Sequence, residues 1–403
     1  MNTTNITQFR IPFGTDLWHK FRTLGLTEEE AATIGCKPYG GGIGASEIGG
    51  ILGLAKNYRP CPQETYHYKV GSIAPTPRAN RAMIRGKILE PIVKDIWTLY
   101  NGDGDESWVS AIEEYQNGDR ATKDMLSVRK AKKTNAYFVN DDFPWLFSSL
   151  DYFAEKGSIG LLPDTNGLPR VHKDGFPVEI KTINKNYASQ WLEGVPPYHV
   201  CQLNQEMICT NSDYGEIAVL FPDDFSFRVY PFNRDEELCE RIIKWSKVFW
   251  DKVVIGREAK KKMDLFYANA QVDNGDEMKS IIESNEPEPD DGEAYYDYMK
   301  ERYQEGYEKS VEGDMTTYFE SLSYQLCNSI INSLKEKQQG YKNNFIKILG
   351  MGGFNQIDFE AQGKITYFEN KNGNRTMLVK TKPLISLDKR SEEEFNKLNL
   401  EVK

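Results

Sequence analysis

The sequence predicts an α/β fold for roughly the first two-thirds of the chain. Three β-type runs lie between residues 136 and 184, and helical patterns precede and follow them. Strands that alternate with helices indicate a sheet covered by helices. A chain of 403 residues exceeds one ordinary core, so we expect two domains, or one domain with a large appendage.

Helical signals dominate the first hundred residues. A short helix is expected around residues 15–23, and Thr27 is a predicted N-cap with Glu30 in the capping-box position. A glycine-rich turn precedes a short helix that begins near Ala45, and another helix follows Pro62. The clearest helix covers residues 80–101, where apolar residues recur at a spacing of three to four. These residues are Ile84, Ile88, Ile92, Ile96 and Leu99.

The pattern changes to strands after residue 136. The β-type runs are residues 136–140, 145–155 and 175–184, and residues 158–175 are expected to form a Gly- and Pro-containing loop. Further along, the predicted elements are a helix over 186–210, strands over 215–222 and 226–232, and an amphipathic helix over 234–255.

Composition divides the chain into three predicted parts. Residues 1–260 form the α/β domain. Residues 261–314 hold 16 acidic and 6 basic residues, which accounts for the whole net charge of −10, so we expect an acidic linker or insertion there. Residues 315–403 are predicted to form a helical extension followed by a β-hairpin around Asn372-Gly373. Because the acidity is local, it does not exclude a basic groove elsewhere.

Several protein classes are not favoured. No run of about 18 apolar residues predicts a membrane span, and the N-terminus does not resemble a secretory signal. The six cysteines form no C-x-x-C pair and no zinc spacing, so we expect reduced thiols in a cytoplasmic protein. An iron–sulfur cluster, the sharper alternative, is disfavoured because the cysteines are scattered.

One group of residues suggests phosphodiester chemistry. Asp151 follows an apolar run, and Glu179 and Lys181 lie two apart on a later strand, so their side chains share one face. Ile180 between them points the opposite way. Two carboxylates and the Ile180 carbonyl are hard oxygen ligands of the kind Mg²⁺ prefers, with Mn²⁺ as a possible substitute. Lys181 would orient or deprotonate the attacking water, or stabilise developing charge. Alone, this pattern is weak evidence for a catalytic site, since an acid-x-Lys pair on a strand more often lies on a solvent-exposed face.

Several further segments occur in one particular order. Trp18-x-x-x-Arg22 precedes G-I-G-A-S-E-I (residues 42–48), and R-G-K-I-L-E-P (85–91) follows. S-L-D (149–151), E-I-K-T (179–182) and Y-x-x-x-Q-x-x-x-E-M (198–207) complete the series. The ordered set resembles the YqaJ-type viral recombinases, a family that includes the phage lambda exonuclease in the PD-(D/E)xK nuclease superfamily. The resemblance covers roughly residues 15–250. It implies a restriction-endonuclease-like core with a central mixed sheet flanked by helices.

The resemblance assigns roles by position. Glu90 resembles the helix-borne acid that completes the metal site, although a solvated helix acid is the plainer interpretation. Gln202 resembles a glutamine near the scissile phosphate, or a buried structural amide. Ser46 resembles a residue that holds the terminal phosphate, or a simple helix cap. Arg22 and Arg85 are candidate phosphate contacts, or they pair with surface acids.

The implied activity is Mg²⁺-dependent 5′–3′ exonuclease digestion of linear double-stranded DNA for phage-type recombination or end processing. Its implied partners are DNA ends, a single-strand annealing protein and, by family resemblance, two further copies in a ring-shaped trimer. A nicking or structure-specific endonuclease or a Cas4-like nuclease is the alternative, followed by a non-catalytic DNA-binding or interaction module. The long spacing between Asp151 and Glu179 is the weak point, because a shifted register would turn Glu179 and Lys181 away from Asp151.

Overall fold

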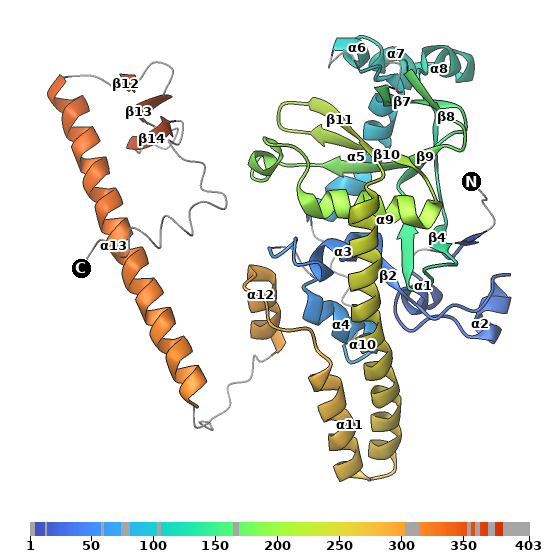
Figure 1. Cartoon of the computed structure of the whole chain (residues 1–403). Helices are drawn as coiled ribbons and strands as arrows, with labels where there is room; N and C mark the ends of the chain where they lie inside the picture. The colour runs from blue at the N-terminus through green and yellow to red at the C-terminus, as the bar shows by residue number, and fades with distance from the viewer. Residues whose placement is uncertain are drawn as a thin grey trace. The chain divides into compact units, whose positions relative to one another are not determined.

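The computed structural model divides the chain into two compact units, residues 1–305 and 306–403, which are described separately (Figure 1). The structure describes residues 5–12, 14–57, 60–73, 81–102, 106–163, 169–302, 314–352, 356–358, 363–369 and 375–381. None of the helices within these ranges is long and apolar enough to cross a membrane.

A five-stranded sheet forms the centre of the first unit, with the strand order β11-β10-β9-β6-β3. β9 and β10 are parallel, and the other neighbouring pairs are antiparallel, so the sheet is mixed. The strands are β3 (Ala131–Lys133), β6 (Tyr152–Ala154), β9 (Phe176–Thr182), β10 (Tyr214–Phe221) and β11 (Ser226–Asn233).

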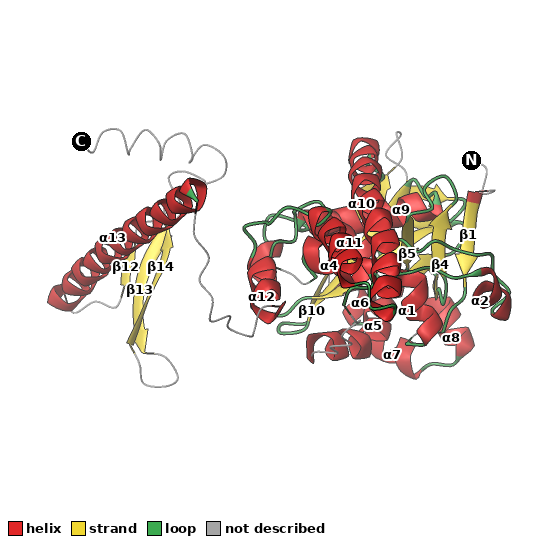
Figure 2. Ribbon diagram, turned by 90° about the horizontal axis from the view of Figure 1, so that it is seen from below, coloured by secondary structure: helices red, strands yellow, loops and turns green. Residues whose placement is uncertain are grey.

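Helices cover both faces of this sheet, as the two views show (Figures 1 and 2). Val178 and Ile180 pack with Trp97 of α5 (Arg81–Leu99) on one face. Ile217 and Val219 pack with Leu203 of α9 (Pro197–Thr210) on the other face. Successive residues of a strand point to opposite faces, which explains why β10 is buried along its whole length. The predicted α/β class, with a mixed sheet flanked by helices, is confirmed.

A second sheet, with the order β1-β4-β5-β2, brings the glycine-rich segment into the same unit. Its strands are β1 (Ile6–Phe9), β2 (Ile43–Gly44), β4 (Tyr137–Asn140) and β5 (Leu146–Ser149). The other helices before β6 are α1 (Asp16–Arg22), α2 (Glu28–Thr33), α3 (Ala45–Ile51), α4 (Pro62–Val70), α6 (Glu106–Val109), α7 (Ile112–Asn117) and α8 (Arg120–Leu126). The predicted capping box of Thr27 and Glu30 is present at the start of α2.

The apolar stripe of α5 is only partly a core stripe. Ile96 is fully buried, but Ile84 and Ile88 are 49% and 65% exposed, so the predicted helix is present while its apolar spacing corresponds to burial only in the second half. The helix contacts the sheet mainly through its second half, after Pro91.

The expected loop over residues 158–175 is instead a two-stranded ribbon. β7 (Ser158–Pro163) pairs antiparallel with β8 (Pro169–His172), and the Leu161 amide donates a 2.8 Å hydrogen bond to the Tyr214 hydroxyl of β10. Because the ribbon forms its own sheet, it does not disturb β9, where Tyr152 stays opposite Val178. The register on which the site depends is therefore kept.

The structure places the described part of the expected acidic linker in helices of the first unit. α10 (Glu236–Ala268) runs past residue 260, and α11 (Val272–Ser284) and α12 (Glu293–Arg302) follow. Buried Ile282 and Tyr298 anchor them, and Tyr66 donates a 2.9 Å hydrogen bond to the Ile282 carbonyl. A few buried apolar side chains are thus enough to hold these helices in the first unit despite their acidic composition. Residues 303–313 lie outside the described part.

The second unit contains α13 (Met315–Gly352) and a three-stranded antiparallel sheet. Its strands are β12 (Gln356–Asp358), β13 (Gly363–Glu369) and β14 (Arg375–Thr381). β13 and β14 pair as the predicted hairpin, whose turn at Asn372-Gly373 lies outside the described residues.

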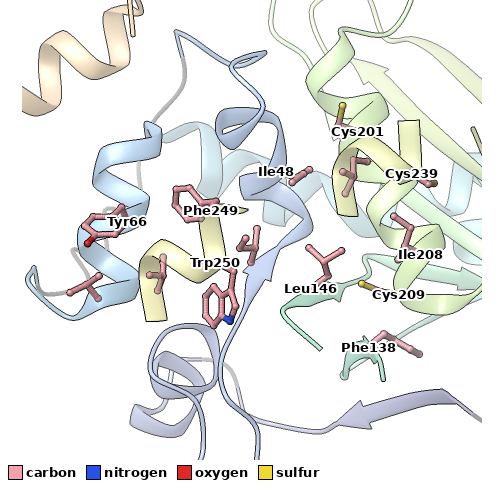
Figure 3. Close-up of a cluster of buried hydrophobic side chains, with 14 of the residues drawn as sticks. Ile48, Tyr66, Phe138, Leu146, Cys201, Ile208, Cys209, Cys239, Phe249 and Trp250 are labelled. Carbon is pink, nitrogen blue, oxygen red and sulfur yellow. The ribbon is translucent and has the colours of Figure 1, made fainter. Parts of the chain in front are cut away.

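A close helix contact fixes α3 against α9. Figure 3 shows Ile48 of α3 among buried side chains that include Cys201 and Ile208 of α9. A Cβ atom at Gly49 would lie 2.6 Å from the Cβ atom of Tyr198, so only glycine allows this approach.

We expect Gly49→Ala to lower the free energy of unfolding by about 1–3 kcal/mol, because the helices must separate. Gly40→Ala is the control, since nothing lies within 4 Å of a Cβ atom there. Urea denaturation measures both variants, and equal midpoints for the two would contradict the close-contact explanation.

Candidate functional site

Asp151 and Glu179 lie on neighbouring strands. Asp151 directly precedes β6, which pairs antiparallel with β9, where Glu179 and Lys181 reside. The Ile180 amide donates a 3.0 Å hydrogen bond to Oδ2 of Asp151, which ties that carboxylate to β9. The structure therefore brings together the three residues that the strand pattern singled out.

Lys181 and Gln202 both contact Glu179. Nζ of Lys181 lies 2.5 Å from Oε1 of Glu179 and 3.1 Å from Oε1 of Gln202. Nε2 of Gln202 donates to the same Glu179 oxygen at 2.6 Å. Gln202 is buried on α9, which covers the face of β9 that presents Glu179 and Lys181. Ile180 faces the opposite core, as strand alternation predicts.

Glu206 is a further acidic residue of this site. It lies one helical turn after Gln202, is only 1% exposed, and accepts a 3.1 Å hydrogen bond from Nε2 of Gln202 through Oε1. Its Oε2 is buried and has no hydrogen-bond partner within the described part of the chain. The sequence motif contained Glu206 but gave it no role. Its i, i+4 spacing from Gln202 was the signal that could have found it.

The electrostatics of the site are dominated by excess negative charge. Burial and the nearby Glu179 carboxylate raise the pKa of Asp151 well above its usual value. Burial, then Glu179 and Asp151, raise the pKa of Glu206 in the same way. Burial alone would lower the pKa of Lys181, but Glu179 and Asp151 outweigh it and raise that pKa. Lys181 thus stays charged and is shared among several acids.

His199 borders Lys181 and Gln202 as a neutral imidazole. Burial, followed by the charge of Lys181, lowers the pKa of His199 to about 2. Its ring centroid lies 4.2 Å from that of Tyr198 and 5.3 Å from that of Trp191. A group this hard to protonate adds no positive charge to the site at neutral pH.

Glu90 and Arg85 lie on α5, which passes close to the end of β9. A Cβ atom at Gly86 would lie 3.8 Å from Oγ1 of Thr182. Glu90 forms a 2.7 Å ion pair with Lys133 and adds to the negative field that raises the pKa of Asp151. Nε of Arg85 is buried and lacks a hydrogen-bond partner in the described structure.

Arg22 and Ser46 are held away from the carboxylate cluster by other contacts. Arg22 lies 3.6 Å from buried Glu47 and stacks over Trp18. Glu47 also pairs with Lys69 at 2.8 Å and accepts a 2.7 Å hydrogen bond from the Gly44 amide at the start of α3. Arg22 therefore pairs with a buried acid rather than a surface acid. Ser46 is exposed in the first turn of α3.

The donor set fits a divalent cation in its chemistry. Asp151, Glu179 and Glu206 are three carboxylates that interact electrostatically and share one ammonium group, and one buried Glu206 oxygen has no donor. Hard oxygen ligands with uncompensated charge suit Mg²⁺. In the described residues, however, no three His, Cys, Asp or Glu side chains already converge as a metal site. All six cysteines are free.

The raised carboxyl pKa values predict a pH dependence for the metal-free protein. The folded state holds protons on Asp151 and Glu206 above the ordinary values of 3.8 and 4.5. This contribution to stability is complete below those values and is lost as pH rises through the raised folded-state pKa values. We expect the free energy of unfolding, measured in EDTA by urea titration, to fall less steeply with pH in Asp151→Asn. Identical slopes for variant and parent would contradict this assignment.

Sequence comparison decides the family. Residues 17–213 match the family model of the YqaJ-like viral recombinase domain. This part of the chain belongs to that family. The family resemblance predicted from the ordered segments is thereby confirmed, and the YqaJ-like domain contains every predicted site residue.

Two crystal structures of LHK-Exo are similar to the chain that carries this YqaJ-like domain. One is LHK-Exo in complex with dAMP, at 16% identity and a TM-score of 0.37, covering 57% of this chain and 94% of that one. The other is an alkaline exonuclease, LHK-Exo from Laribacter hongkongensis, at 15% identity and a TM-score of 0.36, covering 56% and 93%. Comparison with curated proteins finds no match.

Proposed function

We propose that the YqaJ-like domain is a Mg²⁺-dependent exonuclease that degrades linear double-stranded DNA in the 5′–3′ direction for recombination or end processing. The observation that carries the proposal is the cluster of buried Glu179 and Gln202 with half-buried Asp151 and Lys181 on adjoining elements. Two carboxylates, a charged lysine and an orienting amide are what phosphodiester hydrolysis by a bound metal requires.

Asp151, Glu179, Glu90 and the Ile180 carbonyl are the groups that we propose hold the metal. When bound, Mg²⁺ or a substituting Mn²⁺ lowers the pKa of water and offsets charge on the phosphate. Glu90 would exchange its present partner, Lys133, for this role. Ile180 already ties Asp151 to β9 through its amide.

Lys181 and Gln202 supply the chain's own chemistry. Without the metal, Glu179 and Asp151 raise the pKa of Lys181, which keeps its proton. The role that we propose for it is to stabilise developing negative charge and to orient water. Gln202 fixes Glu179 and Lys181 relative to each other through its two amide atoms.

DNA contacts are proposed for Arg85 and Ser46. The unpartnered Nε of Arg85, on the helix that carries Glu90, supports a phosphate contact. Ser46 is exposed in the first turn of α3 and free to meet a phosphate. Arg22 is the weaker candidate, because Glu47 already engages it. A single-strand annealing protein as partner and a ring-shaped trimer remain part of the proposal by family resemblance alone.

One assay tests this function. The full chain is incubated with Mg²⁺ and either linear or covalently closed circular duplex DNA, and the linear substrate is labelled at one 5′ or one 3′ end. We expect loss of linear DNA only, with early release of the 5′ label, and no loss with Lys181→Ala. Cutting of closed circles would instead support an endonuclease. No cleavage with Mg²⁺ or Mn²⁺ would support a non-catalytic binding module.

A further inference from the structure

Glu206 is a buried acid whose carboxyl group lacks a full set of hydrogen-bond partners. An ionised carboxylate in the interior is strongly unfavourable unless cations or hydrogen-bond donors compensate it. Nε2 of Gln202 donates a 3.1 Å hydrogen bond to Oε1 of Glu206, but the same atom also donates to Glu179. Oε2 has no donor within the described structure. The buried carboxyl group of Glu206 therefore lacks a partner for one of its two oxygens.

The charges around Glu206 define what is missing. Asp151, Glu179 and Glu206 bring three negative charges when ionised, and Lys181, which contacts Glu179, returns one positive charge. Glu90 adds a further negative charge when it leaves Lys133. A divalent cation offsets such an excess, whereas a further hydrogen-bond donor would leave it uncorrected.

We infer that Glu206 is part of the divalent-cation site, where its carboxylate helps Asp151 and Glu179 to hold the ion. This inference rests on the proposed function. It adds the buried carboxylate of Glu206 on α9 to those of Glu179 on β9 and of half-buried Asp151 just before β6. Glu179 of β9 and Glu206 of α9 would then bind the same ion.

Binding of Mn²⁺ alone tests the inference without catalysis. Isothermal titration calorimetry of the full chain is expected to show Mn²⁺ affinity lowered about 10- to 100-fold by Glu206→Gln, the range for losing a supporting carboxylate. Glu206→Asp keeps the charge and is expected to lose less. Glu193→Gln, at an exposed glutamate of the same unit, is expected to bind as the parent does.

The outcomes separate the two claims. Parent-like Mn²⁺ affinity in Glu206→Gln, together with lost binding in Asp151→Asn, would overturn the role of Glu206 and leave the proposed function standing. Absence of Mn²⁺ binding by the parent would overturn both. Far-UV circular dichroism and thermal melting of each metal-free variant verify folding, and Glu206→Gln is nearly isosteric.

A second, independent observation is a basic groove away from the carboxylates. A cavity of about 1040 Å³ is lined by residues of β1, β3, β4, β6 and β8 and of the turn after α9. Six of its lining residues are basic and three are acidic (Glu155, Asp174 and Asp213). The basic residues are Arg10, Lys132, Lys133, Lys156, Arg170 and Lys173.

Half of these cations are already neutralised. Lys132 pairs with Glu155 at 2.9 Å, Lys133 pairs with Glu90 at 2.7 Å, and Arg170 pairs with Asp213. Arg10, Lys156 and Lys173 are exposed and have no ion pair with any residue that the structure describes. Phe153, half-buried in the same groove, offers an aromatic face. Unpaired cations beside an aromatic ring suit a single nucleic-acid strand.

We propose that this groove binds the phosphodiester backbone of single-stranded nucleic acid, with Lys133 connecting it to Glu90. The test is fluorescence anisotropy of a labelled single strand with the full chain in EDTA. Changing Arg10, Lys156 and Lys173 together to Gln is expected to weaken binding at least 10-fold. The slope of log affinity against log salt should become shallower by about 2, near 0.7 per lost contact.

The matched control changes exposed Lys244, Lys262 and Lys300 to Gln. Equal weakening in the control, or an effect confined to duplex DNA, would overturn the groove proposal.

Discussion

Asp151→Asn is expected to lower the rate of phosphodiester hydrolysis by about 10²–10³-fold while leaving the metal-free protein at least as stable as the parent at neutral pH. Activity falls because the substitution removes a charged oxygen from the proposed metal site. Stability does not fall, since burial and Glu179 already make ionised Asp151 unfavourable. An asparagine oxygen can still accept the hydrogen bond from the Ile180 amide.

Rates on linear duplex DNA and urea denaturation in EDTA measure the two effects separately. Glu193→Gln, at an exposed acid of the YqaJ-like domain outside both the proposed metal site and the groove, is the control and should keep parental activity. A variant that loses activity together with several kcal/mol of stability would show that Asp151 is structural. Parental activity in Asp151→Asn would remove it from the site.

Arg129→Met is expected to have the largest effect on stability, about 3–5 kcal/mol. Arg129 and Glu216 are 3% and 0% exposed and form a 2.7 Å ion pair beneath the sheet. Glu216 also accepts hydrogen bonds of 2.7 Å from Nε1 of Trp97 and from the hydroxyl of Tyr214. Removing the guanidinium leaves a buried carboxylate without its cation, and it loosens the end of α5 from β10.

Lys130→Met is the neighbouring control, since Lys130 forms an exposed ion pair with Asp124 and should change little. The double variant Arg129→Met with Glu216→Gln should cost less than the sum of the single variants, because it removes both charges. Additive losses in guanidinium denaturation would contradict a coupled buried pair.

The central pattern of the site was readable from sequence because strands alternate. Glu179 and Lys181 share a face for geometric reasons alone, and the structure keeps that face toward α9. Asp151 followed from its place before a short strand, although its pairing with β9 required the tertiary fold. The ordered motifs also located α5 and α9, the helices that carry Glu90 and Gln202.

Other features depended on contacts between distant residues. Glu206 was not recognised because a helical acid is usually solvated, and its spacing from Gln202 gains meaning only from its burial in the structure. The ribbon of β7 and β8 was taken for a loop, since its short strands carry glycine and proline. The acidic composition of residues 261–314 predicted a linker rather than α11 and α12. A few buried side chains fix the position of these helices. The outward-facing first half of α5 shows that apolar periodicity does not by itself prove burial.

Release of nucleotides from linear duplex DNA by the full chain, before and after metal removal, tests the central claim most directly. We expect release in Mg²⁺, none after EDTA treatment, and recovery when Mg²⁺ is added back in excess. Recovery should fail in Asp151→Asn under the same conditions. Release that persists in EDTA, or that Asp151→Asn supports at the parental rate, would contradict a metal-dependent nuclease site at Asp151, Glu179 and Lys181.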